Sequence, residues 1–532
     1  MIRVNEVKLS VDEDRKLLKN KIAKKLRISP EEISSFSIFK ESIDARKRHE
    51  ISFVYIVDVE VTDEERVLRK NKSLQKSPDL RYRDAEAGDG VLKHRPVVVG
   101  TGPAGMFAGL ILAQRGYRPI LLERGQDVDA RTRDVEEFWH NRKLNPESNV
   151  QFGEGGAGTF SDGKLTTRTK DLRSRKALEE FVAAGAPEEI LYAAKPHIGT
   201  DILKTVVKNI RGRIIELGGE VRFGSKVTDI LIENGHVAGI IINDKETLPA
   251  EAVILAIGHS ARDTYQMLHA REVNIRQKPF SIGVRIEHPQ TLINVSQYKE
   301  QAEHPRLGAA DYRLTYQSKN GRSVYTFCMC PGGTVVAAAS ELNTVVTNGM
   351  SEYARDRENA NSAVLVQVGP KDFGSEHPLA GIEYQREWEK AAFVSGGQNY
   401  NAPAQLVGDF LAEKPSTQQG DIKPSFLPAV TFTDLKQCLP AYVVESLQDA
   451  IASLDKKLRG FARSDAVLTG VETRSSAPVR IERDSETMQS MNVAGLYPIG
   501  EGAGYAGGII SATVDGIKVA EKIIGKFKPF SG

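Results

Sequence analysis

The chain has 532 residues, of which 40% are hydrophobic and 27% are charged, and its formal net charge is +2. These values are typical of a globular protein with two or three domains, and the charge alone argues for no nucleic-acid or membrane partner. The sequence has no run of 18 apolar residues and no apolar core at its amino end, so we expect neither a membrane span nor a signal peptide. Three cysteines are too few for a disulfide framework and favour the reducing cytoplasm.

Residues 1–90 are predicted to form a small α+β domain with the element order β-α-α-β-β. Residues 15–27 hold seven basic residues and no acidic one, with apolar residues at helical spacing. Ser29-Pro-Glu-Glu32 has the form of a capping box, and apolar residues alternate from Ile51 to Val59 as in a half-buried strand. The basic helix is either a solvated face or a docking surface for RNA or an acidic partner. A polar stretch at 62–94 should link this domain to the next.

A strand-turn-helix pattern follows. Val97-Val-Val99 reads as a buried parallel strand, and Gly100-Thr-Gly102-Pro103-Ala104-Gly105 has the spacing of a dinucleotide-binding turn. The glycines allow a tight turn, close approach of a pyrophosphate and close packing of the helix, whose free N–H groups would face the phosphates. Glu123 lies 23 residues after Gly100, where a carboxylate can accept hydrogen bonds from both ribose hydroxyls and would repel a 2′-phosphate.

Two later segments extend this site. Residues 252–258 form an apolar run that ends in Ala256-Ile-Gly258, typical of a chain passing close to a dinucleotide. Near the carboxyl end, residues 496–499 read as a strand, Gly500-Glu501 as a turn, and Gly507-Gly508 as the start of a helix over 509–526. A dinucleotide as long as FAD needs contacts beyond one βαβ unit. The sequence therefore predicts non-covalent FAD held between distant parts of the chain.

At these segments the chain resembles the glutathione-reductase-like superfamily of FAD proteins, with Glu501 standing where aspartate is usual. Four further motifs resemble the bacterial family of FAD-dependent dehydrogenases related to the plant FAD-dependent protein C: residues 149–165, 195–201, 328–333 and 347–351. The resemblance spans nearly the whole chain. It implies an α/β fold with a glutathione-reductase-like FAD-binding domain, and a redox role with no settled substrate.

Residues 258–496 exceed what a dinucleotide fold needs. Residues 280–287 and 323–330 alternate like strands, and a helix is expected within 434–459. We therefore assign 1–90 to the amino-terminal domain, 91–275 and 480–532 to the FAD-binding domain, and 276–479 to an inserted α+β substrate domain. The chain has no second GxGxxG, so NAD(P)H, as a transient electron donor, would have to enter the substrate cleft.

The loop at 153–163 is rich in glycine and either passes beside the flavin or is a surface loop. The predicted cofactor contacts are Gly100, Gly102, Pro103, Ala104, Gly105, Glu123, Arg124, Gly125, Arg131, Gly158, Thr159, Ser161, Lys164, Val227, Ala256, Gly258, Gly500, Glu501, Gly507, Gly508 and Ile509. No cysteine or histidine pattern predicts a metal site.

Three residues are candidates for catalysis. Cys328 and Cys330 share a face if their segment is a regular strand, so their thiols could exchange electrons with a flavin, or they could simply be buried small side chains. Arg474 precedes the FAD-closing strand and either clamps a substrate carboxylate or holds two domains together.

The favoured function is an FAD-dependent oxidoreductase that transfers hydride between flavin N5 and a small, anionic or neutral, organic substrate. Two alternatives stay open. One is a flavoprotein docked on RNA or another macromolecule through residues 1–90, and the other is a flavin-binding sensor without catalysis. Monooxygenation is a further alternative for the flavin itself. The substrate, the electron donor and the oligomeric state are not readable from these residues.

Overall fold

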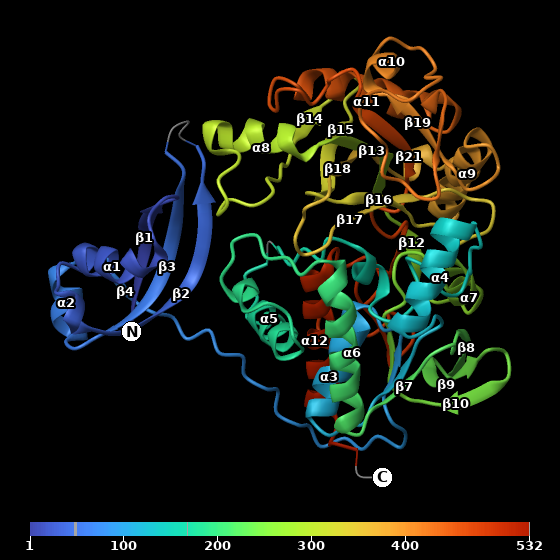
Figure 1. Cartoon of the computed structure of the whole chain (residues 1–532). Helices are drawn as coiled ribbons and strands as arrows, with labels where there is room; N and C mark the ends of the chain where they lie inside the picture. Colours follow the sequence, from blue (N-terminus) through green and yellow to red (C-terminus); the bar gives the residue numbers. More distant parts are fainter. Residues whose placement is uncertain (47–49, 168, 531–532) are drawn as a thin grey trace.

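The computed structural model describes residues 1–46, 50–167 and 169–530. Three sheets organise the chain, and Figure 1 shows the amino-terminal sheet lying to one side of the main body. None of the described helices is long and apolar enough to cross a membrane. Single turns of 3-10 helix occur at η1 (Arg15–Leu17), η2 (Pro30–Glu32), η3 (Gly156–Phe160), η4 (Glu188–Leu191), η5 (Lys299–Gln301), η6 (Pro370–Asp372) and η7 (Leu435–Gln437).

The amino-terminal domain is an antiparallel sheet with the order β2-β3-β1-β4. The predicted basic helix is confirmed as α1, which buries Leu18, Ile22 and Leu26. The alternating strand is confirmed as β3, whose side chains are buried at every second position. The elements are β1 (Ile2–Ser10), α1 (Leu18–Leu26), β2 (Ile33–Asp44), β3 (Ser52–Val61), α2 (Glu64–Lys70) and β4 (Gln75–Lys76).

The predicted order β-α-α-β-β is wrong in two places. The capping box at Ser29 is present, but it opens only the 3-10 turn η2, because the chain enters β2 at Ile33. The stretch expected to be a plain polar link contains α2, capped by Asp63, and the short strand β4. The observed order is therefore β-α-β-β-α-β.

A five-stranded parallel sheet forms the centre of the main body and confirms the α/β class. Its order is β23-β11-β5-β6-β7, so the carboxyl-terminal strand lies beside β11 and is separated from the fingerprint strand β5 by one strand. The pairing of segments far apart in sequence brings residues near 100, 255 and 500 to one edge of the sheet. The strands are β5 (Val97–Val99), β6 (Ile120–Leu122), β7 (Glu220–Arg222), β11 (Val253–Leu255) and β23 (Leu496–Pro498).

Both faces of this sheet are covered. Val98 and Ile254 pack into a core with α3, α6 and α12, while Val97 and Val253 pack into a second core with α7 and a small antiparallel sheet. Figure 1 shows α3, α6 and α12 side by side. The covering elements are α3 (Pro103–Gln114), α4 (Val128–Asn141), α5 (Arg173–Ala183), α6 (Thr200–Glu216), β8 (Val227–Glu233), β9 (His236–Ile242), β10 (Glu246–Pro249), α7 (Arg262–Ala270) and α12 (Ile509–Lys526).

The seven-stranded sheet lies on the carboxyl side of the parallel strands and has the order β14-β15-β18-β13-β21-β19-β20. The chain enters and leaves this part through β12 and β22, which pair with each other. The predicted strands at 280–287 and 323–330 and the helix within 434–459 are confirmed as β13, β15 and α11. The elements are β12 (Ile275–Gln277), β13 (Phe280–Pro289), α8 (Gln290–Tyr298), β14 (Thr315–Gln317), β15 (Ser323–Cys330), β16 (Thr334–Ala337), β17 (Thr347–Met350), β18 (Asn359–Val368), α9 (Ala380–Ser395), β19 (Ala402–Leu406), α10 (Val407–Leu411), β20 (Val430–Phe432), α11 (Ala441–Leu454), β21 (Val467–Glu472) and β22 (Val479–Ile481).

Backbone contacts tie the amino-terminal domain and its linker to the body. Glu41 of β2 exchanges backbone hydrogen bonds with the segment at 192–194, and Arg306 donates to the carbonyl oxygens of Val11 and Glu13. Further along, the linker runs to the carboxyl end of α12, where the Gly88 amide donates to Ile524 O at 2.9 Å.

Candidate functional site

A large cavity lies at the carboxyl edge of the parallel sheet, between that sheet and the seven-stranded sheet. In open α/β sheets this edge is where ligands bind. One end of the cavity is lined by the fingerprint turn and the residues that follow β6 and β11. The other end is lined by residues of β15, β17 and β21, and the start of α12 joins the two.

The fingerprint turn has the geometry that its glycines predict. Gly100 has a φ of 98°, and a side chain there would overlap the carbonyl oxygen of Ala256. A side chain at Gly105 would overlap the carbonyl oxygen of Gly100, so glycine brings α3 against the strand. At Gly102 the nearest atom to an added methyl group would be the Gly156 Cα at 3.8 Å, so the turn is open on the side that faces the cavity.

Glu123 lines the cavity and connects three loops. Its carboxylate accepts from the Thr101 amide at 2.9 Å, the Thr101 hydroxyl at 2.8 Å, and the amides of Gly125 and Gly153 at 3.0 Å each. Each oxygen therefore already has two donors, which is the full capacity of a carboxylate. The structure shows Glu123 as the residue that fixes the fingerprint turn against the glycine loop; its contact with a ribose stays a prediction.

The two predicted arginine contacts differ. Arg124 lines the cavity, but its guanidinium is held by Glu147 and Asp263 and lies 4.2 Å from the centre of the Phe152 ring. Arg131 is fully buried and does not line the cavity. A guanidinium has only donors. Those of Arg131 bind the backbone carbonyl oxygens of residues 149, 150, 153 and 154. The prediction that Arg131 contacts a cofactor is corrected: it supports the loop from behind.

Most of the remaining predicted contacts line the cavity: Gly100, Gly102, Pro103, Ala104, Gly158, Ser161, Lys164, Val227, Ala256, Gly258, Gly500, Glu501, Gly508 and Ile509. Four others do not line it: Gly105, Gly125 and Thr159 are buried behind its wall, and Gly507 is exposed. The Thr159 hydroxyl is turned inward and donates to the Glu154 carbonyl oxygen at 3.1 Å. For Gly105, Gly125 and Thr159, direct contact is corrected to packing that shapes the wall, whereas contact by the exposed Gly507 stays a prediction.

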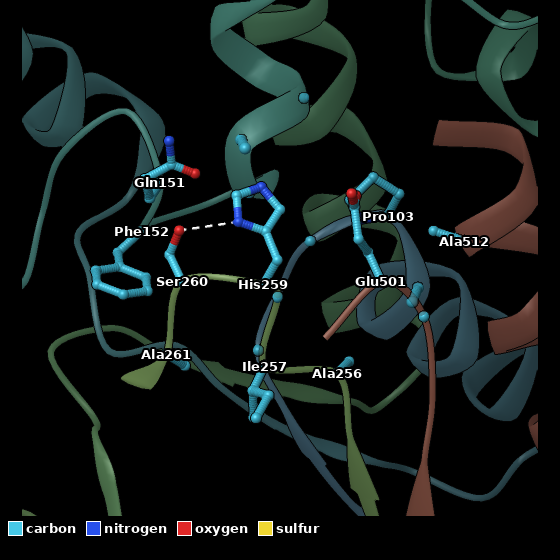
Figure 2. Close-up of a pocket in the computed structure, with 18 of the residues that line it drawn as sticks. Pro103, Gln151, Phe152, Ala256, Ile257, His259, Ser260, Ala261, Glu501 and Ala512 are labelled. Carbon is cyan, nitrogen blue, oxygen red and sulfur yellow. Dashed lines mark hydrogen bonds between the residues drawn. The ribbon is translucent and has the colours of Figure 1, made fainter. Parts of the chain in front are cut away.

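The start of α12 reaches the same cavity. Gly500 and Gly508 have φ values of 71° and 81°, and no side chain caps the first turn of the helix. Glu501 points into the cavity from the turn between them (Figure 2). Burial raises the pKa of Glu501 to about 7, while Lys278 and the Gly508 amide oppose that shift. This carboxyl group is thus poised to change charge near neutral pH.

Arg474 lines the cavity, but its charge is already neutralised. Its Nε and Nη2 donate to both oxygens of the buried Glu389 at 3.0 and 2.9 Å, and Nη1 donates to Ser260 Oγ and Ser340 Oγ at 3.1 and 2.5 Å. Arg262 binds the same carboxylate. The hypothesis that Arg474 clamps a substrate carboxylate is therefore wrong, because the protein supplies that carboxylate itself. The alternative, that Arg474 holds two parts of the chain together, is the arrangement observed.

Cys328 and Cys330 both line the cavity, but their strand is not regular there. The pairing of β15 with β18 shifts between Phe327 and Cys330, and Cys328 has a φ of 41°. The i, i+2 geometry that put both thiols on one face is therefore interrupted by a bulge. The Cys330 thiol lies 3.2 Å from the carbonyl oxygen of Cys328, and both cysteines are unpaired. Cys330 is buried, and burial raises the pKa of its thiol, which keeps it protonated, whereas Cys328 is exposed.

Sequence reasoning missed two lining residues with functional chemistry. Glu472, at the end of β21, binds Arg285 through one carboxylate oxygen at 2.8 Å, and burial raises the pKa of this carboxyl group above its usual value. His259 follows directly after Gly258 and lines the cavity beside Ser260 (Figure 2). Its position after the Ala-Ile-Gly segment was a usable signal, whereas nothing local marked Glu472. Within the described residues, no group of histidine, cysteine or acidic side chains is arranged to hold a metal.

Comparisons with known proteins find one matching family for part of the chain and several similar proteins. Residues 279–475 match a family described as FAD-dependent protein, C-terminal domain-like, and residues 1–60 match a domain of unknown function. A thiamine thiazole synthase from Aeropyrum pernix is 26% identical over 184 residues, which cover 32% of this chain and 56% of that protein. A mutant of halogenase PltM in complex with FAD covers 80% of this chain and 68% of its own, with 11% identity and a TM-score of 0.38.

One relative covers the whole chain. An uncharacterized protein of Clostridium beijerinckii is 56% identical over 529 residues, which are 99% of this chain and 99% of that protein. At that identity and coverage the two proteins share one fold and one family. The chain therefore belongs to the same family as its C. beijerinckii relative, and its residues 279–475 match the family described as FAD-dependent protein, C-terminal domain-like.

Proposed function

We propose that the chain is an oxidoreductase that holds FAD non-covalently and transfers hydride between flavin N5 and a small organic substrate. The observation that carries this proposal is that two long helices open on one cavity without side-chain caps. Helix α3 begins after Gly102 and α12 begins after Gly508, and both starts line the cavity. The substrate would lie at the end of the cavity formed by β15, β17 and β21.

The donor set fits FAD. The first amides of each helix have no partner within the helix, and the helix dipole adds positive potential at that end. The α3 start suits a pyrophosphate, and the α12 start suits the electron-rich pyrimidine edge of a flavin. The open side of Gly102 leaves room for close approach of a ligand. Residues 100–104, Val227 and the turn at 500–501 would hold the rest of the cofactor, as in the glutathione-reductase-like superfamily that the sequence resembles.

When bound, FAD supplies hydride transfer at N5. The residues of the chain would handle the proton and the charge of the substrate. Glu472 is the best placed base, because one oxygen is fixed by Arg285 and burial raises the pKa of the carboxyl group, which favours proton uptake. Lys164 lines the same cavity with 29% of its side chain exposed. Its Nζ lies 3.7 Å from Asp162, which Arg355 binds at 2.5 Å, so Lys164 would have charge to offer an anionic substrate. NAD(P)H, if it is the electron donor, would enter at this end.

The test begins with the purified yellow protein. Heat denaturation should release FAD, and release of FMN or of no flavin would contradict the proposal. Anaerobic addition of NADH or NADPH then identifies the donor by bleaching of the flavin absorbance. A bound flavin that no donor reduces and no acceptor reoxidises would favour the sensor over the enzyme.

The exposed basic face of α1 supports a second candidate, docking of the flavoprotein on RNA or another acidic macromolecule. Lys24 and Lys25 of α1, Lys16 of the 3-10 turn before it and Arg27 directly after it are all exposed. Retention of the full chain on immobilised RNA that is lost with salt, and lost on reversing these four charges, would support docking. Salt-insensitive retention, or none, would leave α1 a solvated face.

The three unpaired cysteines support the proposal of a reducing, cytoplasmic location.

A further inference from the structure

His259, Ser260 and Arg474 form a hydrogen-bonded chain that ends at the cavity. His259 Nδ1 lies 3.0 Å from Ser260 Oγ, as the dashed line in Figure 2 marks. Arg474 Nη1 lies 3.1 Å from the same oxygen. These hydrogen bonds join the turn after β11 to the segment after β21, so they connect the two sheets that enclose the cavity.

The direction of these hydrogen bonds follows from the chemistry of the groups. A guanidinium has donors and no acceptor, so Arg474 must donate to Ser260 Oγ. Among the described residues, His259 Nδ1 is the acceptor within reach of the remaining Ser260 hydrogen. A hydroxyl oxygen can also accept a second hydrogen bond, so the 3.0 Å contact alone permits both tautomers. Donation by Ser260 is the arrangement that gives its hydrogen a partner, and it places the hydrogen of a neutral imidazole on Nε2.

The surrounding charges keep the ring neutral. Burial is the largest cause and lowers the pKa of His259 to about 3, and the positive charges of Arg474 and Arg262 act in the same direction. Glu389 opposes the shift, but its carboxylate is shared by both arginines. Glu341 also pairs with Arg262, so the two arginines have two carboxylates, and a protonated His259 would add a positive charge with no carboxylate of its own.

We propose that Arg474 and Ser260 fix His259 in the tautomer with hydrogen on Nε2, so that a neutral ring offers the cavity a hydrogen-bond donor. In the described part of the chain no other residue accepts from Nε2, which leaves this donor for a ligand of the cavity. A donor of this kind selects an oxygen or nitrogen with a free lone pair and rejects an ammonium group. Ser260 and Arg474 are positioning residues, and the inference holds for the protein with or without cofactor.

Imidazole nitrogen NMR of the full chain, labelled with 15N-histidine, tests the assignment. The chain has ten histidines, and His259→Gln identifies the signal of His259 by its loss. At pH 8 we expect a protonated Nε2 and an unprotonated Nδ1 at His259, unchanged down to pH 5. His288 is a matched control, because its Nε2 lies 2.8 Å from the carbonyl oxygen of Phe461 and must carry hydrogen.

Substitution of Ser260 separates positioning from mere packing. Ser260→Ala should lose the single tautomer, so that a population with hydrogen on Nδ1 appears, while Ser260→Thr keeps the hydroxyl and should restore the wild-type pattern. An unchanged tautomer in a folded Ser260→Ala protein would overturn the proposal. Wild-type protein with hydrogen on Nδ1 of His259, or with a charged ring at pH 6, would overturn it without any variant.

Discussion

The two ends of the cavity differ in the kind of polar group that lines them, backbone amides at one end and side chains at the other. The end near α3 and α12 is mostly backbone, because glycines and uncapped helix starts present amides, and Glu123 holds the loops together. The end near β15 and β21 is mostly side chains whose charges are neutralised by other side chains, as Arg474 is by Glu389 and Arg285 by Glu472. The first end therefore has donors available for an extended anion. At the second end, only the few polar atoms without a partner in the protein are available to a ligand.

This difference predicts where substitutions will act. Changes at the backbone-built end should alter cofactor retention, because its donors await a ligand. Changes among the paired side chains at the other end should alter stability first, because each charge there depends on its partner inside the protein.

The largest effect is expected at Glu389. Glu389→Ala would leave Arg262 and Arg474 buried without their shared carboxylate, which should lower the free energy of unfolding by about 3–5 kcal/mol. Denaturant unfolding measures the loss. The matched control is Glu383→Ala on the same helix, whose 65% exposed side chain pairs with Arg386 and should cost at most about 1 kcal/mol. Equal losses in the two variants would contradict the distinction between buried and exposed pairs.

Glu123 tests the other end. Glu123→Gln keeps the shape but points an amide group at donors that now bind the carboxylate, and each charge-assisted bond contributes about 1.5–3 kcal/mol. We expect the protein to fold with less FAD per chain, measured by absorbance after gel filtration. Glu147→Gln is the control, since Glu147 lies nearby, is 45% exposed and binds Arg124 and Lys226. A full complement of FAD in Glu123→Gln would remove this residue from cofactor binding.

Two glycines of α12 test how the helix starts are held together. A side chain at Gly516 would overlap the carbonyl oxygen of Ala104 in α3, so Gly516→Ala should destabilise the protein by about 1–3 kcal/mol and weaken FAD retention. Gly525→Ala meets no atom within 4 Å and should be neutral or stabilising by about 0.5–1 kcal/mol. If both variants melt at the wild-type temperature, the close crossing of α3 and α12 is not required.

Glu501 gives a pH-dependent effect. The folded pKa of about 7 lies above the ordinary value of 4.5, so the stabilisation from Glu501 is complete below pH 4.5 and is lost as the pH rises through 7. The full shift corresponds to about 3 kcal/mol, and screening at the open cavity reduces this to about 1–2 kcal/mol. We therefore expect the free energy of unfolding of flavin-free Glu501→Gln, relative to that of the wild type, to rise by that amount between pH 5 and pH 8. A constant difference across this range would show that Glu501 ionises normally.

The smallest effect is expected at the cysteines. Anaerobic titration with dithionite should end at two electrons per FAD, because the bulge at Cys328 keeps the two thiols from sharing one face of β15. Cys330→Ala should leave the end point unchanged. A four-electron end point that falls to two in the variant would make the thiol pair a redox partner of the flavin.

The backbone-built end was predictable because its signals are local. Gly100, Gly102 and Gly105 stand within six residues, and their spacing alone describes the turn. The fate of Arg474 was not predictable, because Glu389 lies 85 residues away and only the packing of α9 brings it there. The bulge at Cys328 likewise depends on the pairing of β15 with β18, which no spacing within β15 reveals.

The linker shows where the molecule can be cut. Residues 77–96 follow the amino-terminal sheet, and the amides of Gly88 and Gly90 bind the carbonyl oxygens of Ile524 and Lys526 in the last turn of α12. Tyr82 adds a hydrogen bond to Glu521 of the same helix at 2.9 Å. A protease or a truncation that removes residues 1–76 would spare these bonds, whereas removal of 1–90 would uncap the helix whose other end opens on the cavity. By packing, the linker belongs to the domain that follows it.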